Sequence, residues 1–495
     1  MTSERDKVRL IFGLKIKQLR TELGISTYEL ANRTNLSPSY LNEIEKGKKY
    51  PKTEKLFALA KALNTDYDTL VSLRVSKQLE PVVELLNSNI LSELPFDLFG
   101  IEPGYFLEVM ANAPTKLSAF ISTLIEIGRN YDLRVEQFFF SVLRTYQAMH
   151  DNYFADLETE ASQFLTEHPL PKTSIDCPDW LTQVLTDEYG CTVQVYDAQT
   201  HPELTTLRSV YLPEKKTLLL NDKLSVEQRA FTLAREVGYH RLNLTVRPLE
   251  SSMLEARSFD EVLNNFRASY FARAVLIPRQ PLLDSLTQLV TLPTWDNDRL
   301  LALMEPFAVT PEMFLLRMTN LLTSHFGQRE LFFLRFNHGP DGRFRLSKEL
   351  HLSKLHTPHG VARDEHYCRR QVSVTILNEL RALQQENQWD GRPICRAQRI
   401  TFATNGNAYF VFSIAKSSPP STDNSSINIG FPLTDELRQV FRFVDDRAIP
   451  ETLVGETCQR CPITNCEVRA ALPVVLTKQQ HVKLVLGRIE ELRGV

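Results

Sequence analysis

Three of the seven cysteines in this chain lie within nine positions near its C-terminus, spaced as Cys-x2-Cys-x4-Cys. They are Cys458, Cys461 and Cys466. Thiolates at this spacing can reach one metal centre, either an iron–sulfur cluster or structural zinc, and a further ligand must then come from elsewhere in the chain. The alternative is a group of buried thiols without metal. Three further cysteines have no such spacing and are expected to be core or surface thiols: Cys177, Cys191 and Cys395.

The first 50 residues contain a second group of side chains, whose spacing suits DNA recognition. Residues 27–33 and 38–46 are expected to form two short helices joined by a tight turn, the arrangement of a helix-turn-helix. In that motif the second helix enters the major groove, where polar side chains reach base edges, and nearby lysines bind phosphates. The candidate DNA-binding residues are Thr27, Ser37, Pro38, Ser39, Tyr40, Asn42, Glu43, Lys46, Lys48 and Lys49.

This segment resembles the Cro and phage-repressor (XRE) family of helix-turn-helix domains. The resemblance rests on residues 23–26 (LGIS), 29–31 (ELA), 39–41 (SYL) and 44–48 (IEKGK). It implies a double-stranded DNA operator as the partner. One departure is Thr27, where many relatives carry a glutamine that contacts a phosphate. Because one such domain makes too few contacts for a specific site, we expect a homodimer with half-sites about one helical turn apart, or a multiple of that.

Residues 231–240 (FTLAREVGYH) resemble the helix of zinc peptidases with an H-E-x-x-H motif, in which two histidines bind zinc and the glutamate is the general base. Here Arg235 and Tyr239 stand at the histidine positions, on either side of Glu236. His240 is one residue further on, which turns its side chain by about 100° around the helix. The third, acidic ligand falls on Arg267. The region therefore resembles an ImmA/IrrE-type peptidase domain that has lost its zinc site.

Arginines in a former metal pocket favour an anion, because a guanidinium group binds phosphate through two hydrogen bonds. We therefore interpret Arg235, Tyr239 and Arg267 as candidate effector-binding residues. The alternative is that the arginines form structural salt bridges with Glu236 or another acid.

The order of these segments, ending in the tail 458–473 (CQRCPITNCEVRAALP), resembles the short-chain fatty acyl transcriptional regulator family. That resemblance implies a GAF-like effector domain, a short-chain acyl-CoA as effector and a [4Fe–4S] cluster. It also indicates Cys368 as the fourth ligand, although Arg369 and Gln371 replace the usual neighbours of that cysteine.

The order of the expected helices and strands predicts a multidomain fold, with an α-helical N-terminal half followed by α+β domains. We expect an XRE-type five-helix DNA-binding domain at 8–73 and a helical connecting or dimerisation region at 78–168. A degenerate ImmA/IrrE-like domain, zincin-like but without metal ligands, should follow at 175–290. A GAF-like domain with the cysteine cluster should occupy 310–480. The proline-rich segment 168–179 is the expected linker, and 416–426 (KSSPPSTDNSS) is expected to be a solvated loop.

The composition is typical of a soluble multidomain protein, and with the zinc ligands missing we expect a DNA-binding regulator and no enzyme. The chain has 495 residues, of which 43% are hydrophobic and 24% charged, as expected for several globular domains. Neither an apolar run of membrane-spanning length nor a signal peptide is visible, so we expect a cytoplasmic protein without membrane contact. Residues 1–75 carry 14 Lys and Arg against 9 Asp and Glu, although the net charge of the chain is −3, so the first domain alone should meet a polyanion.

Two other functions remain open at this point. A redox- or metal-sensing transcription factor would use the cysteine cluster as its signal and the arginines as structure. A metal-dependent peptidase that cleaves a partner repressor is disfavoured because the zinc ligands are missing.

Overall fold

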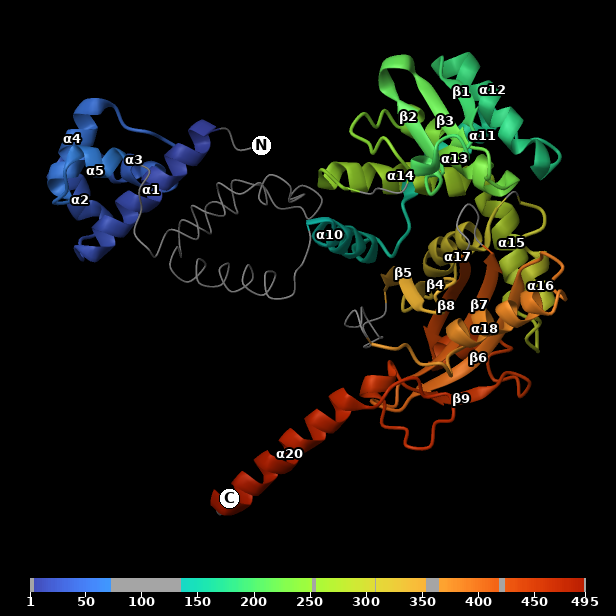
Figure 1. The fold of residues 1–495 in the computed structure, drawn as a ribbon. Coiled ribbons are helices and arrows are strands. Elements are labelled where there is room, and N and C mark those ends of the chain that lie inside the picture. The colour runs from blue at the N-terminus through green and yellow to red at the C-terminus, as the bar shows by residue number, and fades with distance from the viewer. Residues whose placement is uncertain are drawn as a thin grey trace. The chain divides into compact units, whose positions relative to one another are not determined.

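A computed structural model describes residues 4–72, 135–251, 255–307, 309–352, 365–417 and 423–493 (Figure 1). The chain forms two compact units, Met1–Val142 with Ala256–Asp260, and Leu143–Glu255 with Glu261–Val495. Most of the helical region expected at 78–168 falls on residues 73–134, which lie outside the described residues.

The N-terminal domain consists of five helices, as the sequence predicts. They are α1 (Glu4–Glu22), α2 (Thr27–Thr34), α3 (Pro38–Glu45), α4 (Thr53–Ala62) and α5 (Tyr67–Val71). The side chain of Ser26 caps α2 by accepting from the backbone N–H of Glu29, and Ser37 caps α3 in the same way, with Pro38 at its first position. These side chains satisfy donors that a helix N-terminus otherwise leaves unpaired, which is why the helices begin there.

The second helix of the helix-turn-helix is fixed against α1. Leu30, Leu41 and Ile44 are fully buried in the core of this domain. A Cβ at Gly13 would lie 2.2 Å from the carbonyl oxygen of Ile44, so the close approach of α1 to α3 requires glycine. Arg20 of α1 forms a bidentate pair with Glu45 at 2.6 and 3.0 Å. The packing therefore fixes the orientation of α3 and of the face that it exposes.

Helices continue in the middle of the chain and occupy part of the expected linker. They are α10 (Val135–Met149), α11 (Ala155–Glu167), a 3-10 turn (Ser174–Asp176) and α12 (Cys177–Tyr189). The expectation of a linker throughout 168–179 is wrong at its C-terminal end. Pro178 stands in the first turn of α12, where a proline has no backbone bond to lose, and Cys177 and Pro178 are buried.

A small sheet follows, with strand order β1-β3-β2. Its strands are β1 (Thr192–Tyr196), β2 (Ser209–Leu212) and β3 (Thr217–Asn221), the first parallel and the second antiparallel to β3. Helices α13 (Val226–Arg241) and α14 (Phe259–Leu276) come next, and α12 packs against α13. Ser225 and Gln228 form a capping box at the start of α13. The segment Val226–Arg241 that carries the peptidase-like motif is thus a helix, as predicted.

Three more helices lead to the larger sheet. They are α15 (Arg279–Val290), α16 (Asn297–Ala302) and α17 (Pro311–His325). The sheet has the order β5-β4-β8-β7-β6-β9 and is antiparallel except for the pairing of β9 with β6. Its strands are β4 (Phe332–His338), β5 (Phe344–His351), β6 (Ile394–Phe402), β7 (Ala408–Ser417), β8 (Asn424–Pro432) and β9 (Glu451–Val454).

Helix α18 (Val372–Gln385) packs across this sheet, burying Ile376, Leu377 and Leu380 against residues of β4, β6 and β7 (Figure 1). A second cluster of aromatic rings joins Trp295, Phe410 and Phe443. The sheet is therefore part of a substantial core.

The solvated loop expected at 416–426 is wrong at both ends, because β7 continues to Ser417 and β8 begins at Asn424. All nine residues of β8 are buried. Its polar side chains find partners inside: Asn424 exchanges hydrogen bonds with Gln384, and the Ser426 hydroxyl donates to the carbonyl oxygen of Ser373 at 2.6 Å. Composition alone could not reveal these partners.

The remaining elements are α19 (Asp435–Val440), a 3-10 turn at Cys458–Arg460 and the helix α20 (Val474–Arg493). None of the described helices is long and apolar enough to span a membrane.

Candidate functional site

The predicted DNA-reading face is largely accessible. Five of the ten candidates are exposed: Ser37, Ser39, Asn42, Lys48 and Lys49. The other five are half-buried: Thr27, Pro38, Tyr40, Glu43 and Lys46. The first turn of α3 thus presents hydroxyl and amide groups, with lysines directly after the helix, as major-groove recognition requires.

Two candidates on α3 also have structural contacts. Tyr40 packs against the domain core, and the Lys55 ammonium lies 4.3 Å from its ring centroid. Glu43 forms an ion pair with Lys49 at 2.8 Å on the surface. Asn42 and Ser39 are therefore better placed to contact bases than Tyr40 or Glu43. Tyr28 on α2, 74% exposed, is a further surface residue that the sequence pattern did not single out.

The peptidase-like helix holds its glutamate in an ion pair. Glu236 is buried, and Arg247 donates to its two oxygens at 2.7 and 2.5 Å. The Arg247 guanidinium lies 3.9 Å from the Tyr239 ring centroid and 4.1 Å from that of Tyr211. Burial alone would raise the pKa of Glu236, but its contacts with His240 and Arg247 outweigh burial and hold the pKa below its usual value. A fixed cation thus neutralises this carboxylate, so it is poorly suited to act as a general base.

Each of the three effector candidates has a structural contact of its own. Arg235 lies over the ring of Phe231, and the buried Tyr239 donates its hydroxyl to Asn265 Oδ1 at 2.9 Å. Arg267 instead pairs with Asp156 of α11 at 3.3 Å. Glu236 is paired, but with Arg247, which the sequence pattern did not indicate because it lies in the segment after the helix.

A basic pocket lies between the peptidase-like region and the larger sheet, within one compact unit. Its volume is about 190 Å³. The residues that define its chemistry are Arg208 before β2, Gln228 on α13, Glu312 on α17, Arg335 on β4, Lys416 on β7, and Trp389 between α18 and β6. Arg335 donates to Glu312 at 2.8 Å and to the Ser425 hydroxyl at 3.2 Å, while Lys348 pairs with Glu312 at 3.0 Å.

The charges of this pocket are unbalanced. Burial lowers the pKa of Arg208; Glu312 opposes this effect, and Arg335 and Arg235 add to it. Burial would raise the pKa of Glu312, but Arg335, Lys348 and Arg208 outweigh it and hold that pKa well below its usual range. One ionised carboxylate therefore faces several cations. Buried charge without compensation is costly, so the pocket favours an anionic ligand such as a phosphate.

The four candidate metal ligands in the tail lie in one region of the fold. Tyr367 and Thr457 form an antiparallel bridge, which places the segment containing Cys368 beside that containing Cys458. The N–H of Gly455 donates to Cys368 Sγ and that of Ala470 to Cys458 Sγ, both at 3.3 Å.

Gly455 also determines the position of Cys461. A Cβ at Gly455 would lie 2.7 Å from Cys461 Sγ, so Cys461 packs directly on the glycine that donates to Cys368. Burial raises the pKa of Cys368, the donated N–H groups lower it, and the nearby Cys461 and Cys458 raise it again. Cys368, Cys458 and Cys461 are buried, and Cys466 is half-buried.

Two arginines fix the loop around these sulfurs, one through backbone carbonyl oxygens and the other through an ion pair. Arg469 donates to the carbonyl oxygen of Cys458 at 2.9 Å and also to that of Ile463. Arg460 pairs with Glu365 at 2.7 Å, and the Thr457 hydroxyl donates to the same carboxylate at 2.6 Å. The loop is therefore built around its arginines as well as its cysteines.

Comparison with known proteins finds matches for two regions of the chain. Residues 16–70 match the helix-turn-helix family, and residues 188–319 match the IrrE N-terminal-like domain of the M78 peptidases. An uncharacterized HTH-type transcriptional regulator, y4dJ, of Sinorhizobium fredii is 32% identical over 65 residues, which make up 13% of this chain and 84% of that protein. The solved structure of a Mycobacterium tuberculosis transcriptional regulator is similar over 67% of this chain and 93% of its own, at 22% identity and a TM-score of 0.47.

The fold of the first domain and its exposed α3 define a DNA-binding module. This chain belongs to the HTH-type transcriptional regulators of the XRE kind, and it carries an IrrE-like domain in the middle.

Proposed function

We propose that this protein is a bacterial transcriptional regulator whose operator binding is controlled by an anionic small molecule, with a short-chain acyl-CoA as the effector. The observation that carries the proposal is the basic pocket around Arg208, Arg335 and Lys416, in the unit that contains the IrrE-like domain. A CoA thioester carries phosphates that such a pocket would bind. At about 190 Å³ the pocket is smaller than a pocket for a whole drug-sized ligand, so it would hold only the phosphate-bearing part.

The pocket revises the choice of effector residues. Arg235 adds positive charge near Arg208 but does not line the pocket, and Arg267 is engaged by Asp156, so Arg208, Arg335 and Lys416 become the main candidates. A ligand that prefers one arrangement of the two domains around the pocket would shift the population of that arrangement, which is what allosteric control of the operator requires. The six-stranded sheet with α18 across it supports a GAF-like effector domain. We assign the protein no enzymatic activity, because Arg235, Tyr239 and Arg267 replace the zinc ligands.

Reversing one charge in the pocket tests this assignment. Lys416→Glu is expected to weaken acetyl-CoA or propionyl-CoA binding by about 10- to 100-fold, the loss of one charge-assisted phosphate contact. Isothermal titration calorimetry measures the affinity, and the exposed Lys478→Glu on α20 is the matched control. An unchanged affinity in Lys416→Glu, with a loss in Arg267→Glu, would transfer the effector site to Arg267. Unchanged affinity in both Lys416→Glu and Arg267→Glu would refute the pocket as the effector site.

We also propose that Cys368, Cys458, Cys461 and Cys466 bind a [4Fe–4S] cluster. Donation of backbone N–H groups to sulfur, seen at Cys368 and Cys458, is one of the means by which proteins tune such clusters. Zinc held at about 2.3 Å by each thiolate would bring the sulfurs to within roughly 4 Å of one another. The group of candidate ligand atoms that lie within 4.8 Å of one another among the described residues does not include these cysteines, so zinc would require their sulfurs to move closer together. A redox-sensing input through this centre is the second candidate function.

Metal analysis of anaerobically purified protein tests the tail assignment. We expect broad absorption near roughly 400 nm with stoichiometric iron and sulfide, and we expect Cys461→Ser to lose both. The buried Cys395→Ser on β6 should retain them. A colourless protein with about one zinc per chain would establish structural zinc instead, and a chain without either metal would contradict the assignment.

Operator binding as a homodimer is the remaining part of the proposal. Light scattering should give twice the mass of one chain, and the protected operator should contain two half-sites whose centres are about one helical turn, or a multiple, apart. A monomer that binds a single half-site would contradict it.

A further inference from the structure

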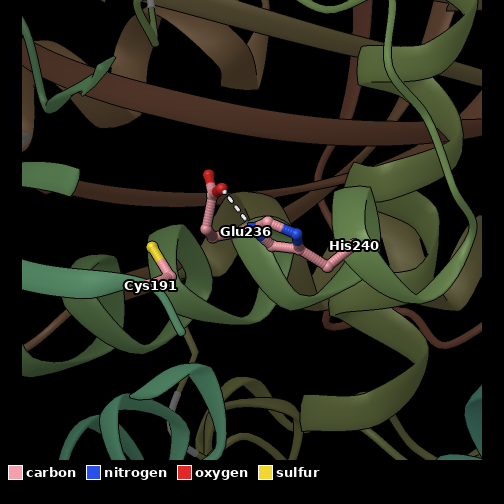
Figure 2. Close-up of side chains that lie close together, drawn as sticks. All are labelled: Cys191, Glu236 and His240. Atoms are coloured by element: carbon pink, nitrogen blue, oxygen red, sulfur yellow. Dashed lines mark ion pairs between the residues drawn. The ribbon is translucent and has the colours of Figure 1, made fainter. Parts of the chain in front are cut away.

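A cysteine, a glutamate and a histidine come together beside the peptidase-like helix, outside the pocket and the tail. Cys191 directly precedes β1, and Glu236 and His240 lie one turn apart on α13 (Figure 2). One potential ligand atom from each of the three side chains lies within 4.8 Å of the others. Spacing along the chain predicts only a core or surface thiol at Cys191 and a His240 turned away from the former metal site, so it does not indicate this group.

The surroundings hold these side chains in place. The His240 ring stacks on Tyr189, with centroids 5.0 Å apart, and meets the edge of Tyr211 at 6.2 Å. Its Nε2 is buried and lies 3.2 Å from Glu236 Oε1 without an aligned hydrogen bond. Cys191 and Glu236 are 0% and 2% exposed. An imidazole nitrogen, a thiol and a carboxylate are thus gathered out of water.

We propose that Cys191, Glu236 and His240 form a binding site for a zinc-like divalent cation, displaced by one residue along α13 from the positions Arg235 and Tyr239. Thiolate, imidazole and carboxylate are all zinc ligands, and three protein ligands leave a fourth position for water. A thiolate among them favours Zn²⁺ or Co²⁺ over the hard cations Mg²⁺ and Ca²⁺. The site shares only Glu236 with the peptidase motif, where that residue would be the base.

Cation binding at this site must overcome two obstacles. Burial raises the pKa of the Cys191 thiol to about 11, so the cation must displace one proton, which leaves to solvent as the sulfur–metal bond forms. Arg247, which holds both oxygens of Glu236, must release Oε1 to the cation. The other titratable side chains packed around the site are Tyr189 and Tyr211, whose rings contact His240, and Tyr239, whose ring lies against Arg247. Affinity should therefore rise with pH, because protons compete with the cation for Cys191.

Cobalt titration of the full chain, with its tail centre as purified, tests the proposal. Cobalt(II) bound to thiolate absorbs in the visible and near-ultraviolet, so each filled thiolate site is counted directly. We expect the wild-type chain to bind one equivalent more than Cys191→Ala. Cys177→Ala is the matched control, because Cys177 is also buried, with a pKa likewise raised to about 11, but has no such neighbours. Equal cobalt equivalents in wild type and Cys191→Ala would overturn the site.

A second variant and a second readout keep the test decisive if Cys191→Ala folds poorly. His240→Phe should also lose the equivalent while keeping the ring stack on Tyr189. Calorimetry of Zn²⁺ binding in buffers of different ionisation enthalpy should show about one proton released per cation at this site. Loss of the additional cobalt equivalent in both variants supports the site. Zn²⁺ binding without proton release would refute the role of Cys191 as a ligand. Operator and effector binding do not depend on this result, so its failure leaves the proposed function untouched.

Discussion

Replacing Arg317 with methionine is expected to lower the free energy of unfolding of the C-terminal unit by about 3–5 kcal/mol. The Arg317 side chain is 0% exposed and forms a bidentate pair with Glu158, which is 4% exposed. Its Nε also donates to the carbonyl oxygen of Ile277 at 3.0 Å. Removing the guanidinium leaves a buried carboxylate with only the Tyr270 hydroxyl, at 2.7 Å, as its donor.

Arg329→Met is the control that separates the effect of a buried ion pair from the loss of an arginine at the surface. Arg329 pairs with Asp151 at 3.2 Å, but it is 70% exposed, and surface pairs contribute about 0–1 kcal/mol. Thermal and urea unfolding of the three proteins give the difference. Similar losses in Arg317→Met and Arg329→Met would contradict the special role of the buried pair. The double variant Glu158→Leu with Arg317→Met should recover much of the loss, because neither charge is then left alone.

The same pair predicts how stability depends on pH. Burial would raise the pKa of Glu158, but Arg317 and Tyr270 outweigh it and hold the pKa below its usual value. A carboxyl group with a depressed pKa in the folded state stabilises the protein above its unfolded pKa, about 4.3. That contribution is lost as the pH falls through the lower, folded value. Arg317→Met should therefore lose less stability than the wild type on acidification through this range.

The pair also explains how the fold positions the proposed effector pocket. Glu158 lies on α11, Tyr270 on α14 and Arg317 on α17, so the three side chains join three helices. Glu312 stands at the start of α17 and faces the cations of the pocket. An effector response that weakens in Arg317→Met before the fold is lost would therefore indicate a displaced α17.

Local signals explain why the N-terminal domain could be predicted from the sequence. The caps Ser26 and Ser37, the first-turn Pro38 and the apolar positions Leu30, Leu41 and Ile44 lie within one short segment, and each acts through its near neighbours. Helix α13 could be predicted for the same reason, because its motif and its cap are local.

The sites could not be predicted to the same extent, because they depend on residues far apart in the chain. Arg208 and Lys416 are separated by 208 positions and meet only because two domains pack together. Cys191 gains its neighbours from a helix that begins after three strands. The partner of Glu236 is Arg247 rather than Arg235, because the chain beyond α13 returns to the helix. Spacing along the sequence indicates none of these contacts.

Asn42→Ala is expected to weaken operator binding by about 10- to 100-fold for each base pair that its amide reads, while non-specific DNA binding stays nearly the same. The asparagine is exposed on α3, and a bidentate amide–adenine contact contributes about 1–3 kcal/mol of discrimination. The operator is first selected from random DNA with the wild-type chain, and fluorescence anisotropy then gives both affinities at fixed salt.

Replacing the lysines that follow α3 should affect DNA binding differently from Asn42→Ala. This contrast tests how the domain docks on DNA. Lys48→Ala and Lys49→Ala should weaken specific and non-specific binding alike, and each should reduce the slope of log affinity against log salt by about one. Lys49 is tied to Glu43, so its replacement should have the smaller effect of the two. If Asn42→Ala changes the salt slope while Lys48→Ala changes base preference, α3 cannot be the helix in the major groove. If instead Asn42→Ala reduces specificity and the lysine variants reduce the salt slope, then α3 contacts the bases and the lysines bind the DNA phosphates. Only a contact with a base edge can change specificity while the charge stays the same.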